Sequence, residues 1–262
     1  MPVKKSIVGL GHRTVNTVWR LGFAARFFAL TLMYSGTSFR RFGLTIREMF
    51  FSGVLSLIII VVAGMFVGMV LGFQGYETLK RYGSESALGS LVALSLVREL
   101  GPVLAALLFA SRAGSAMTAE IGLMKATEQI DAMELMAVNP IARVIAPRFW
   151  SGVISMPLLS CIFSFMGVFG GYVVGVVAIG VDEGSFWSQM QSAVDFQHDI
   201  MNGLIKSFVF GVAVTVISLF EGFDAPPTAE GVSGATTRTV VESSLAILML
   251  DFILTAFMFR GD

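Results

Sequence analysis

The amino-acid sequence predicts an all-α polytopic membrane protein, and two features of its composition lead to this prediction. The 262 residues include 18 basic and 18 acidic ones, so that 14% of the chain is charged, against roughly 25% in soluble proteins. Apolar residues make up 55%. A soluble domain of this length needs a charged surface that this chain lacks, and the zero net charge argues against a basic protein that binds nucleic acid.

Five stretches with few or no charges locate the membrane spans. A helix needs about 20 mostly apolar residues to cross a bilayer. No charged residue occurs between Glu48 and Glu77 or between Arg148 and Asp182. From such gaps we predict spans over residues 51–74, 90–117, 149–179, 201–221 and 240–260. The third is long enough to tilt or to include a turn outside the membrane, and the sequence leaves both open.

The N-terminal segment 12–34 mixes aromatic residues such as Trp19 with Arg13, Arg20 and Arg26. These charges would be costly inside hydrocarbon, so we predict a helix that lies along the membrane interface. A basic tail with some aromatic residues is the alternative.

The distribution of basic residues predicts the orientation of the chain. If the N-terminus is cytoplasmic, thirteen of the eighteen Lys and Arg residues fall on the cytoplasmic side and five on the other. Because cytoplasmic loops are enriched in Lys and Arg, we predict a cytoplasmic N-terminus and, with five spans, a C-terminus on the opposite side.

Small residues recur every fourth position in four of the predicted spans. Such stripes let helices approach closely, so plain helix packing is the interpretation we favour, and a cavity wall or a homodimer seam is the alternative. The stripes are Gly64, Gly68 and Gly72; Ala106, Ala110, Gly114 and Thr118; Gly167, Gly171 and Gly175; and Gly203, Ser207, Gly211 and Thr215.

Three ionisable residues inside the predicted spans are candidates for function, because charge at membrane depth is costly. Arg98 and Glu99 fall near the outer end of the second span, and we interpret them as a polar collar at the mouth of a cavity that meets a polar headgroup. The alternative is an arginine that reaches the interface and a glutamate satisfied by a neighbouring helix. For Asp251, near the middle of the fifth span, we favour a structural hydrogen bond to a Ser or Thr over a proton relay.

Residues 127–138 predict a short amphipathic helix between the second and third spans, on the cytoplasmic side. Thr127 is a candidate N-cap, and Asn139 with Pro140 is expected to end the helix. Acidic residues spaced by three share one face of this helix, and apolar residues lie elsewhere on it. We interpret it as a docking helix for a cytoplasmic partner, with a solvated connector as the alternative.

Motifs for catalysis, nucleotide binding and metal binding are absent from the sequence. There is no G-x-x-x-x-G-K-[ST] loop, no C-x-x-C or H-E-x-x-H pattern and no G-x-S-x-G elbow. We therefore expect no catalytic residue, no metal site and no cofactor in this chain. A transporter subunit is the simplest interpretation.

Five longer stretches resemble a known family. Residues 98–104 (RELGPVL), 111–116 (SRAGSA), 119–122 (AEIG), 128–133 (EQIDAM) and 231–241 (GVSGATTRTVV) closely resemble the MlaE family of ABC-transporter permeases. The one departure is Ser233, where the family usually has glycine. The resemblance covers nearly the whole chain.

The resemblance implies a permease in the inner membrane of a Gram-negative bacterium, present as a homodimer. Such permeases work with a cytoplasmic MlaF-like ABC ATPase that binds ATP and Mg²⁺, a MlaB-like STAS-domain protein and a periplasmic MlaD-like hexamer of MCE domains. Together they move glycerophospholipids between the inner and outer membranes and maintain the lipid asymmetry of the outer membrane.

The resemblance also implies two sets of site residues. A lipid cavity is expected near the outer ends of the first two spans, at Leu71, Thr78, Tyr82, Arg98, Glu99 and Leu100. The segment 127–138 matches the coupling helix that docks on the ATPase, with contacts expected at Glu120, Glu128, Asp131, Met133 and Glu134.

Three other functional classes remain open at this point. A stand-alone secondary transporter would use Asp251 and Glu99 as proton sites, and a membrane scaffold would only anchor a periplasmic lipid-binding ring. A lipid-modifying enzyme is the third, although the sequence offers it no catalytic group. The direction of lipid movement and the headgroup preference do not follow from the sequence.

Overall fold

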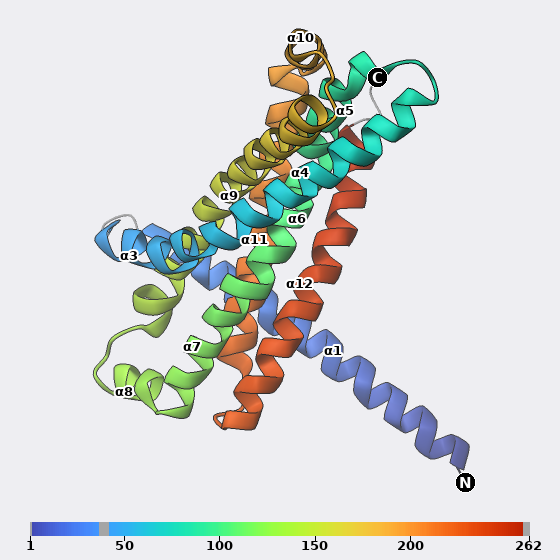
Figure 1. Ribbon diagram of the computed structural model, residues 1–262. Coiled ribbons are helices and arrows are strands. Elements are labelled where there is room, and N and C mark those ends of the chain that lie inside the picture. Colours follow the sequence, from blue (N-terminus) through green and yellow to red (C-terminus); the bar gives the residue numbers. More distant parts are fainter. Residues whose placement is uncertain (1, 37–41, 259–262) are drawn as a thin grey trace.

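The computed structural model describes residues 2–36 and 42–258, and over these ranges the chain forms helices and no strands (Figure 1). Five helical segments are long and apolar enough to cross a membrane: Phe42–Lys80, Glu85–Ala126, Ile141–Ala178, Phe196–Asp224 and Ala229–Met258. The prediction of an all-α polytopic protein with five spans is confirmed.

The described residues contain eleven α-helices, labelled as in Figure 1. They are α1 (Pro2–Met33), α3 (Phe42–Ser52), α4 (Leu57–Lys80), α5 (Leu88–Ser95), α6 (Gly101–Phe109), α7 (Ser115–Ala126), α8 (Gln129–Leu135), α9 (Ala146–Tyr172), α10 (Glu183–Ala193), α11 (Met201–Asp224) and α12 (Ala229–Met258). Short 3₁₀ turns, Val54–Ser56 and Glu85–Ala87, precede α4 and α5. Wider π-helical turns join or extend the others: Leu96–Leu100, Ala110–Gly114, Ile141–Ile145, Val173–Ala178 and Phe196–Ile200.

Each helical segment is longer than the span predicted for it. The apolar stretch only sets the part that hydrocarbon can cover, whereas the helix continues beyond it, at both ends of the first, second and fourth segments and at the N-terminal end of the third and fifth. The third segment is a continuous helix rather than a helix and a turn, and it ends at Ala178. The last two residues of the predicted fifth span, 259–260, lie outside the described residues.

The glycine stripes of the first and third segments pack against each other. A Cβ atom on Gly68 of α4 would lie 1.8 Å from the carbonyl oxygen of Gly167 on α9, and one on Gly64 would lie 2.8 Å from that of Phe163. Inside a membrane the hydrophobic effect does not drive helices together, so they associate mainly through van der Waals packing. Small residues strengthen this packing because they let the two backbones approach closely. Plain helix packing, the interpretation favoured from the sequence, is therefore confirmed for this pair.

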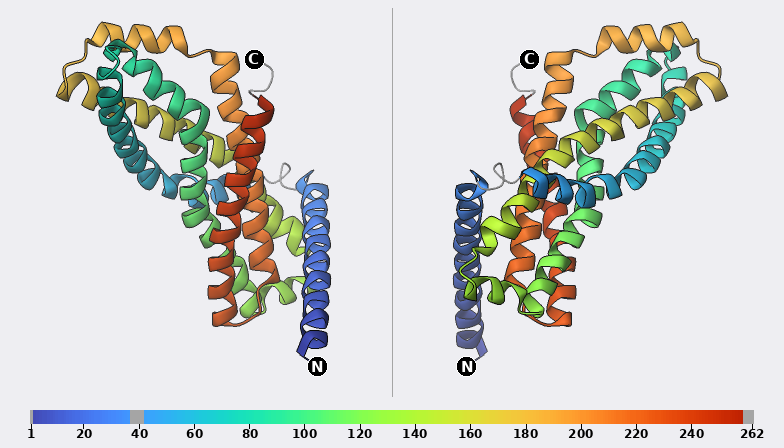
Figure 2. Two further views of the ribbon diagram at one scale, coloured as in Figure 1. Left: turned by 90° about the vertical axis from the view of Figure 1, so that its right-hand side faces the viewer. Right: turned by 90° about the vertical axis from the view of Figure 1, so that its left-hand side faces the viewer.

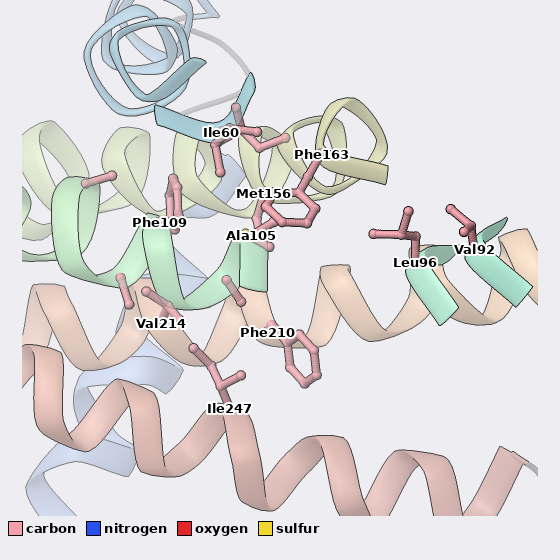
Figure 3. Packing of buried hydrophobic residues seen from close by; sticks show 14 of the residues in the cluster. Ile60, Val92, Leu96, Ala105, Phe109, Met156, Phe163, Phe210, Val214 and Ile247 are labelled. Atoms are coloured by element: carbon pink, nitrogen blue, oxygen red, sulfur yellow. The ribbon is translucent and has the colours of Figure 1, made fainter. Parts of the chain in front are cut away.

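A cluster of buried apolar side chains lies where the long helices meet. Phe109 of α6, Phe163 of α9 and Phe210 of α11 are fully buried in it, together with Ile60 of α4 and Ile247 of α12 (Figure 3). This cluster holds the spans in a fixed arrangement, so that polar side chains on different spans keep defined positions relative to one another.

The two ends of the bundle carry different elements. The short helix α8, the end of α11 and the start of α12 lie at one end, and α10 and the end of α12 lie at the other (Figure 2). The sequence did not predict α10, which Asp182 caps by accepting a hydrogen bond from the Ser185 amide over 2.7 Å.

A helix is present at the predicted N-terminal position, and it is longer than expected. The first part of α1 stands clear of the other helices (Figure 1). Further along, Phe27 is buried against Phe220 and Phe223 of α11. Its placement along a membrane interface remains a prediction.

The helix predicted over residues 127–138 is shorter, Gln129–Leu135. Thr127 ends α7 instead of capping the next helix, because its amide and hydroxyl both donate to the Leu123 carbonyl. Glu128 and Ala137 then adopt left-handed backbone conformations, with φ of 57° each, and these bound α8 on both sides. The Asn139 side chain accepts from the Ile141 amide over 2.9 Å, so it begins the next helix rather than ending this one.

Candidate functional site

Three membrane-spanning segments contribute charged groups to one cluster. Lys206 of α11 has a fully buried side chain, and its ammonium donates to Glu99 Oε2 over 2.6 Å and to Thr255 Oγ1 over 2.7 Å. Asp251 Oδ1 of α12 lies 3.3 Å from the same ammonium. One cation thus faces two carboxylates. Because Glu99 is 37% exposed and Asp251 22% exposed, the acidic side of this cluster is the accessible one.

The backbone of the second segment departs from a regular α-helix where it contacts Lys206. The π-helical turn Leu96–Leu100 carries both Arg98 and Glu99, and such turns are frequent at functional sites. Pro102 follows, and it has no amide hydrogen to donate to the carbonyl four residues earlier. That carbonyl belongs to Arg98, and it accepts a hydrogen bond from the Lys206 ammonium over 3.2 Å. The proline therefore leaves an acceptor for the buried lysine.

A second ion pair lies next to this cluster. Arg98 Nε donates to Asp199 Oδ1 over 2.5 Å, and the Asp199 side chain is fully buried. The other Asp199 oxygen accepts from the Asp195 amide over 2.8 Å, at the start of the fourth segment. One oxygen of the Asp199 carboxylate therefore pairs with Arg98, and the other is fixed by a backbone amide.

Sequence reasoning singled out Arg98 and Glu99 but not the groups that hold them. Lys206 lay inside the predicted fourth span, and a lysine there is itself a signal once carboxylates occur in neighbouring spans. The hydroxyl that was expected for Asp251 is not the partner found, because this carboxylate forms an ion pair with Lys206. Nothing in the sequence pointed to Asp199.

Of the other predicted lipid residues, Leu100 follows Glu99 on the same turn, whereas Leu71, Thr78 and Tyr82 lie on or just after α4. Leu71 and Leu100 are half-buried and pack against the central apolar cluster. Thr78 is exposed and donates back to the Gln74 carbonyl over 2.9 Å, and Tyr82, just after α4, is 79% exposed. The structure brings Arg98, Glu99 and Leu100 together on one turn, and contact of all six residues with a lipid stays a prediction.

The helix α8 is anchored by apolar residues and exposes acidic ones. Ile130 is buried and Met133 is half-buried in a cluster that includes Phe27. Glu128, Asp131 and Glu134 are exposed, and Leu135 and Met136 are exposed beside them. Because Glu128 precedes the helix in a left-handed conformation, only Asp131 and Glu134 of the three share its face. The remaining predicted contact, Glu120, lies on α7 and accepts from Arg148 Nη2 over 3.0 Å.

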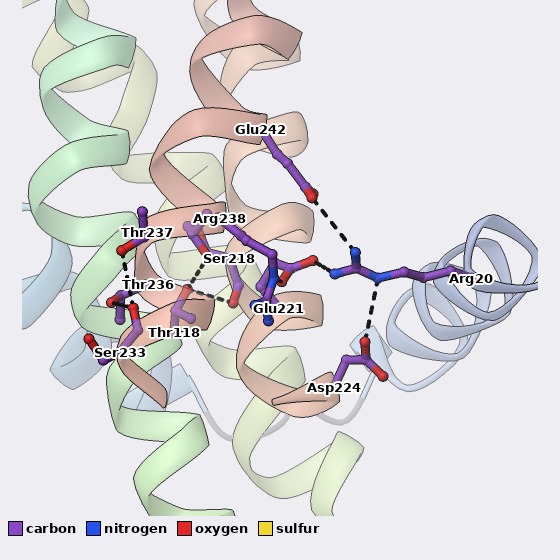
Figure 4. Close-up of polar contacts among 11 residues, drawn as sticks. Arg20, Thr118, Ser218, Glu221, Asp224, Ser233, Thr236, Thr237, Arg238 and Glu242 are labelled. Carbon is purple, nitrogen blue, oxygen red and sulfur yellow. Dashed lines mark hydrogen bonds and ion pairs between the residues drawn. The ribbon is translucent and has the colours of Figure 1, made fainter. Parts of the chain in front are cut away.

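An ionic cluster that the sequence did not predict ties α1 to this end of the bundle. The Glu221 side chain on α11 is fully buried and pairs with Arg20 of α1 and, over 2.8 Å, with Arg238 of α12 (Figure 4). Arg20 also reaches Asp224 and Glu242, at 3.5 and 3.9 Å. Three helices therefore meet around one buried carboxylate.

Comparison with known proteins places these features in a family. The family described as "Permease MlaE" matches residues 45–257. The chain is 56% identical, over 97% of both chains, to the "Intermembrane phospholipid transport system permease protein MlaE" of Haemophilus influenzae. It is 35% identical, over 96% of both chains, to a "Probable ABC transporter permease protein" of Rickettsia bellii.

A plant protein is a more distant relative. The chain is 31% identical to "Protein TRIGALACTOSYLDIACYLGLYCEROL 1, chloroplastic" of Arabidopsis thaliana, over 83% of this chain and 62% of the plant protein. The family match covers the charged cluster, the glycine stripes and α8 together. The chain belongs to the MlaE family of permeases.

Proposed function

We propose that this chain is the membrane-spanning permease subunit of an ABC transporter that moves glycerophospholipids between the inner and outer membranes of a Gram-negative bacterium. The observation that carries the proposal is the 56% identity, over nearly the full length, to a relative named for intermembrane phospholipid transport. The charged cluster on three spans supports it, because such groups at membrane depth mark the pathway of a polar substrate.

In this proposal the polar and apolar parts of a phospholipid contact different residues. Arg98 attracts the phosphate, since a guanidinium donates charge-assisted hydrogen bonds to phosphate oxygens. Leu71, Leu100 and Tyr82 contact the acyl chains, and Thr78 lies at the edge of this region. Glu99 and Lys206 form the polar wall beside the headgroup.

The proposal assigns ATP hydrolysis to a separate MlaF-like ATPase, which would hold ATP and Mg²⁺. The exposed acidic residues, Leu135 at the end of α8 and Met136 just after it suit a docking surface with an apolar centre and a charged rim. Because Ile130 anchors α8 to the spans, movement of a docked ATPase would be transmitted to the bundle.

The same proposal includes the assembly and its orientation. The chain forms a homodimer and works with a MlaB-like STAS-domain protein and a MlaD-like hexamer of MCE domains in the periplasm. The N-terminus and α8 face the cytoplasm, and the C-terminus faces the periplasm. The positions of α8 and of the end of α12 at opposite ends of the bundle support this orientation (Figure 2).

The test is reconstitution of the full chain, with and without its co-expressed partners, in liposomes that contain a fluorescent phospholipid. We expect lipid transfer to require the ATPase partner and hydrolysable ATP. Transfer by the chain alone, driven by a proton gradient and indifferent to ATP, would establish the secondary transporter instead. Full transfer by assembled complexes whose charged cluster has been neutralised would establish the scaffold.

A further inference from the structure

An apolar cavity of about 630 Å³ lies between α9, α10, α11 and the turn Leu96–Leu100. Most of its lining residues belong to these three helices. Its open side carries Cys161 and Phe165 of α9 and Leu204 of α11, all of them exposed. The six residues predicted for the lipid site do not line it within the described part of the chain.

The lining suits hydrocarbon and offers nothing for a charged headgroup. The residues that α10 contributes, Trp187, Met190 and Gln191, follow the spacing of one helix face, and Val194 lines the cavity just after the helix ends. Among the described residues that line the cavity, none is charged, and the polar ones carry only hydroxyl, thiol or amide groups. Its volume falls in the usual range of small-ligand pockets, about 300–1,000 Å³.

The position of α10 closes one end of the cavity. Phe186 is fully buried, and the ring of Tyr172 contacts both Phe186 and Trp187, with centroids 5.9 and 5.5 Å apart. The Tyr172 hydroxyl also donates to Glu183 over 2.9 Å. Tyr and Trp gather at the membrane interface, so α10 lies at headgroup level and the cavity lies in the hydrocarbon below it.

The length of the cavity distinguishes between possible occupants. Along α9 its lining runs from Ser160 to Phe169, which is about 14 Å at 1.5 Å per residue. That is roughly half of a hydrocarbon core about 30 Å thick. A spanning helix of a partner would need a groove through both leaflets, whereas one acyl chain occupies one leaflet only.

We propose that this cavity binds one acyl chain of a phospholipid from the leaflet next to α10. The site is separate from the predicted lipid site at the charged cluster. Acyl-chain binding here follows from the shape and lining of the cavity and does not require transport. If no acyl chain bound here, the proposed function would still stand. If the chain did not transport lipid, this binding site would still stand.

The test uses the complex of the full chain with its partners in nanodiscs of phosphatidylethanolamine and phosphatidylglycerol. A trace of phosphatidylethanolamine with a diazirine at the end of one acyl chain is photolysed, and adducts are mapped by mass spectrometry. We expect adducts concentrated on the α9 and α10 lining. Cys161→Trp and Leu204→Trp, which fill the cavity, should lower their yield about tenfold, as loss of two or so buried methylenes would.

Leu158→Trp is the matched control, since Leu158 is exposed on α9 and does not line the cavity. Its adduct yield should equal that of the unaltered chain. Adducts that filling does not reduce would show ordinary surrounding lipid and overturn the proposal. A photoreactive benzoylphenylalanine in place of Phe165, an aromatic residue at the open side of the cavity, gives a second measurement. Its capture of a partner's transmembrane segment in place of lipid would also overturn it.

Discussion

The ammonium of Lys206 lies 2.6 Å from Glu99 Oε2, although 107 positions separate the two residues in the chain. The same ammonium faces Asp251, so one buried cation holds two carboxylates from two other spans. An uncompensated charge in this position would be costly, and the three groups therefore depend on one another.

Lys206→Met should destabilise the bundle, because it leaves two carboxylates without their cation. The expected cost is about 3 kcal/mol, the lower end for a broken buried pair, since Glu99 retains some exposure. The measurement is the thermal unfolding midpoint of the detergent-solubilised complex. Adding Glu99→Gln should restore part of the stability but not lipid transport. Lys80→Met, at an exposed lysine that ends α4, is the control, and an unchanged midpoint in Lys206→Met would contradict the prediction.

The spans could be predicted from the sequence because hydropathy and gaps between charges are local properties. The bounds of α8 could not, since they depend on left-handed conformations at Glu128 and Ala137, and neither residue type demands one. The helix α10 escaped prediction because it is short and half polar, and packing on Tyr172 secures it.

Only some of the residues of the candidate site could be predicted from the sequence. Arg98 and Glu99 stand out because charges in apolar segments are rare. Their partners Asp199 and Lys206 are more than 100 positions away, and only the packing of the spans brings them together. Such ion pairs depend on tertiary structure, which the pattern of apolar and charged residues along the sequence does not predict.

Arg98→Ala should lower lipid transport while the complex still assembles, because it removes the group proposed to attract the phosphate. Glu99→Ala should act in the same direction through Lys206. The measurement is ATP-dependent transfer of a fluorescent phospholipid, normalised to the amount of assembled complex. Asp199→Asn is the comparison: it weakens the support of Arg98 without removing the guanidinium, so its loss should be smaller. Transport at the unaltered rate in the Arg98→Ala, Glu99→Ala double variant would refute the polar collar.

Charge reversal at Glu128 and Asp131 should release or uncouple the ATPase. Both side chains are exposed, Asp131 on α8 and Glu128 just before it, so the change alters the surface and leaves the buried anchor Ile130 intact. Co-purification of the ATPase and its turnover rate are the measurements. Glu85→Lys, at an exposed acidic residue before α5, is the matched control and should change neither. Normal binding and turnover in the reversed variant would show that α8 is a connector.

Gly68→Ala should destabilise the contact between α4 and α9. The added Cβ would lie 1.8 Å from the Gly167 carbonyl oxygen, a backbone atom that cannot move aside without shifting a helix. Overpacking of this kind costs about 1–3 kcal/mol or more. Gly22→Ala is the control, because its Cβ would meet nothing within 4 Å and alanine favours the helix. Equal unfolding midpoints for the two variants would mean that the helices separate more easily than the packing indicates.

Arg20→Ala should loosen α1 from the bundle, because Arg20 is the residue of α1 that pairs with the buried Glu221. Arg238 would remain on that carboxylate, so the spans should stay folded while α1 becomes accessible. Limited proteolysis of the solubilised complex measures this, and we expect faster cleavage between α1 and α3 with little change in the unfolding midpoint. Glu221→Ala should do more, since it leaves two arginines without their shared partner and should lower the midpoint as well. Arg26→Ala, at an exposed arginine of the same helix, controls for loss of positive charge from α1. If Arg20→Ala and Arg26→Ala were cleaved at the same rate, α1 would be held by its aromatic contacts with α11 and not by the ion pair.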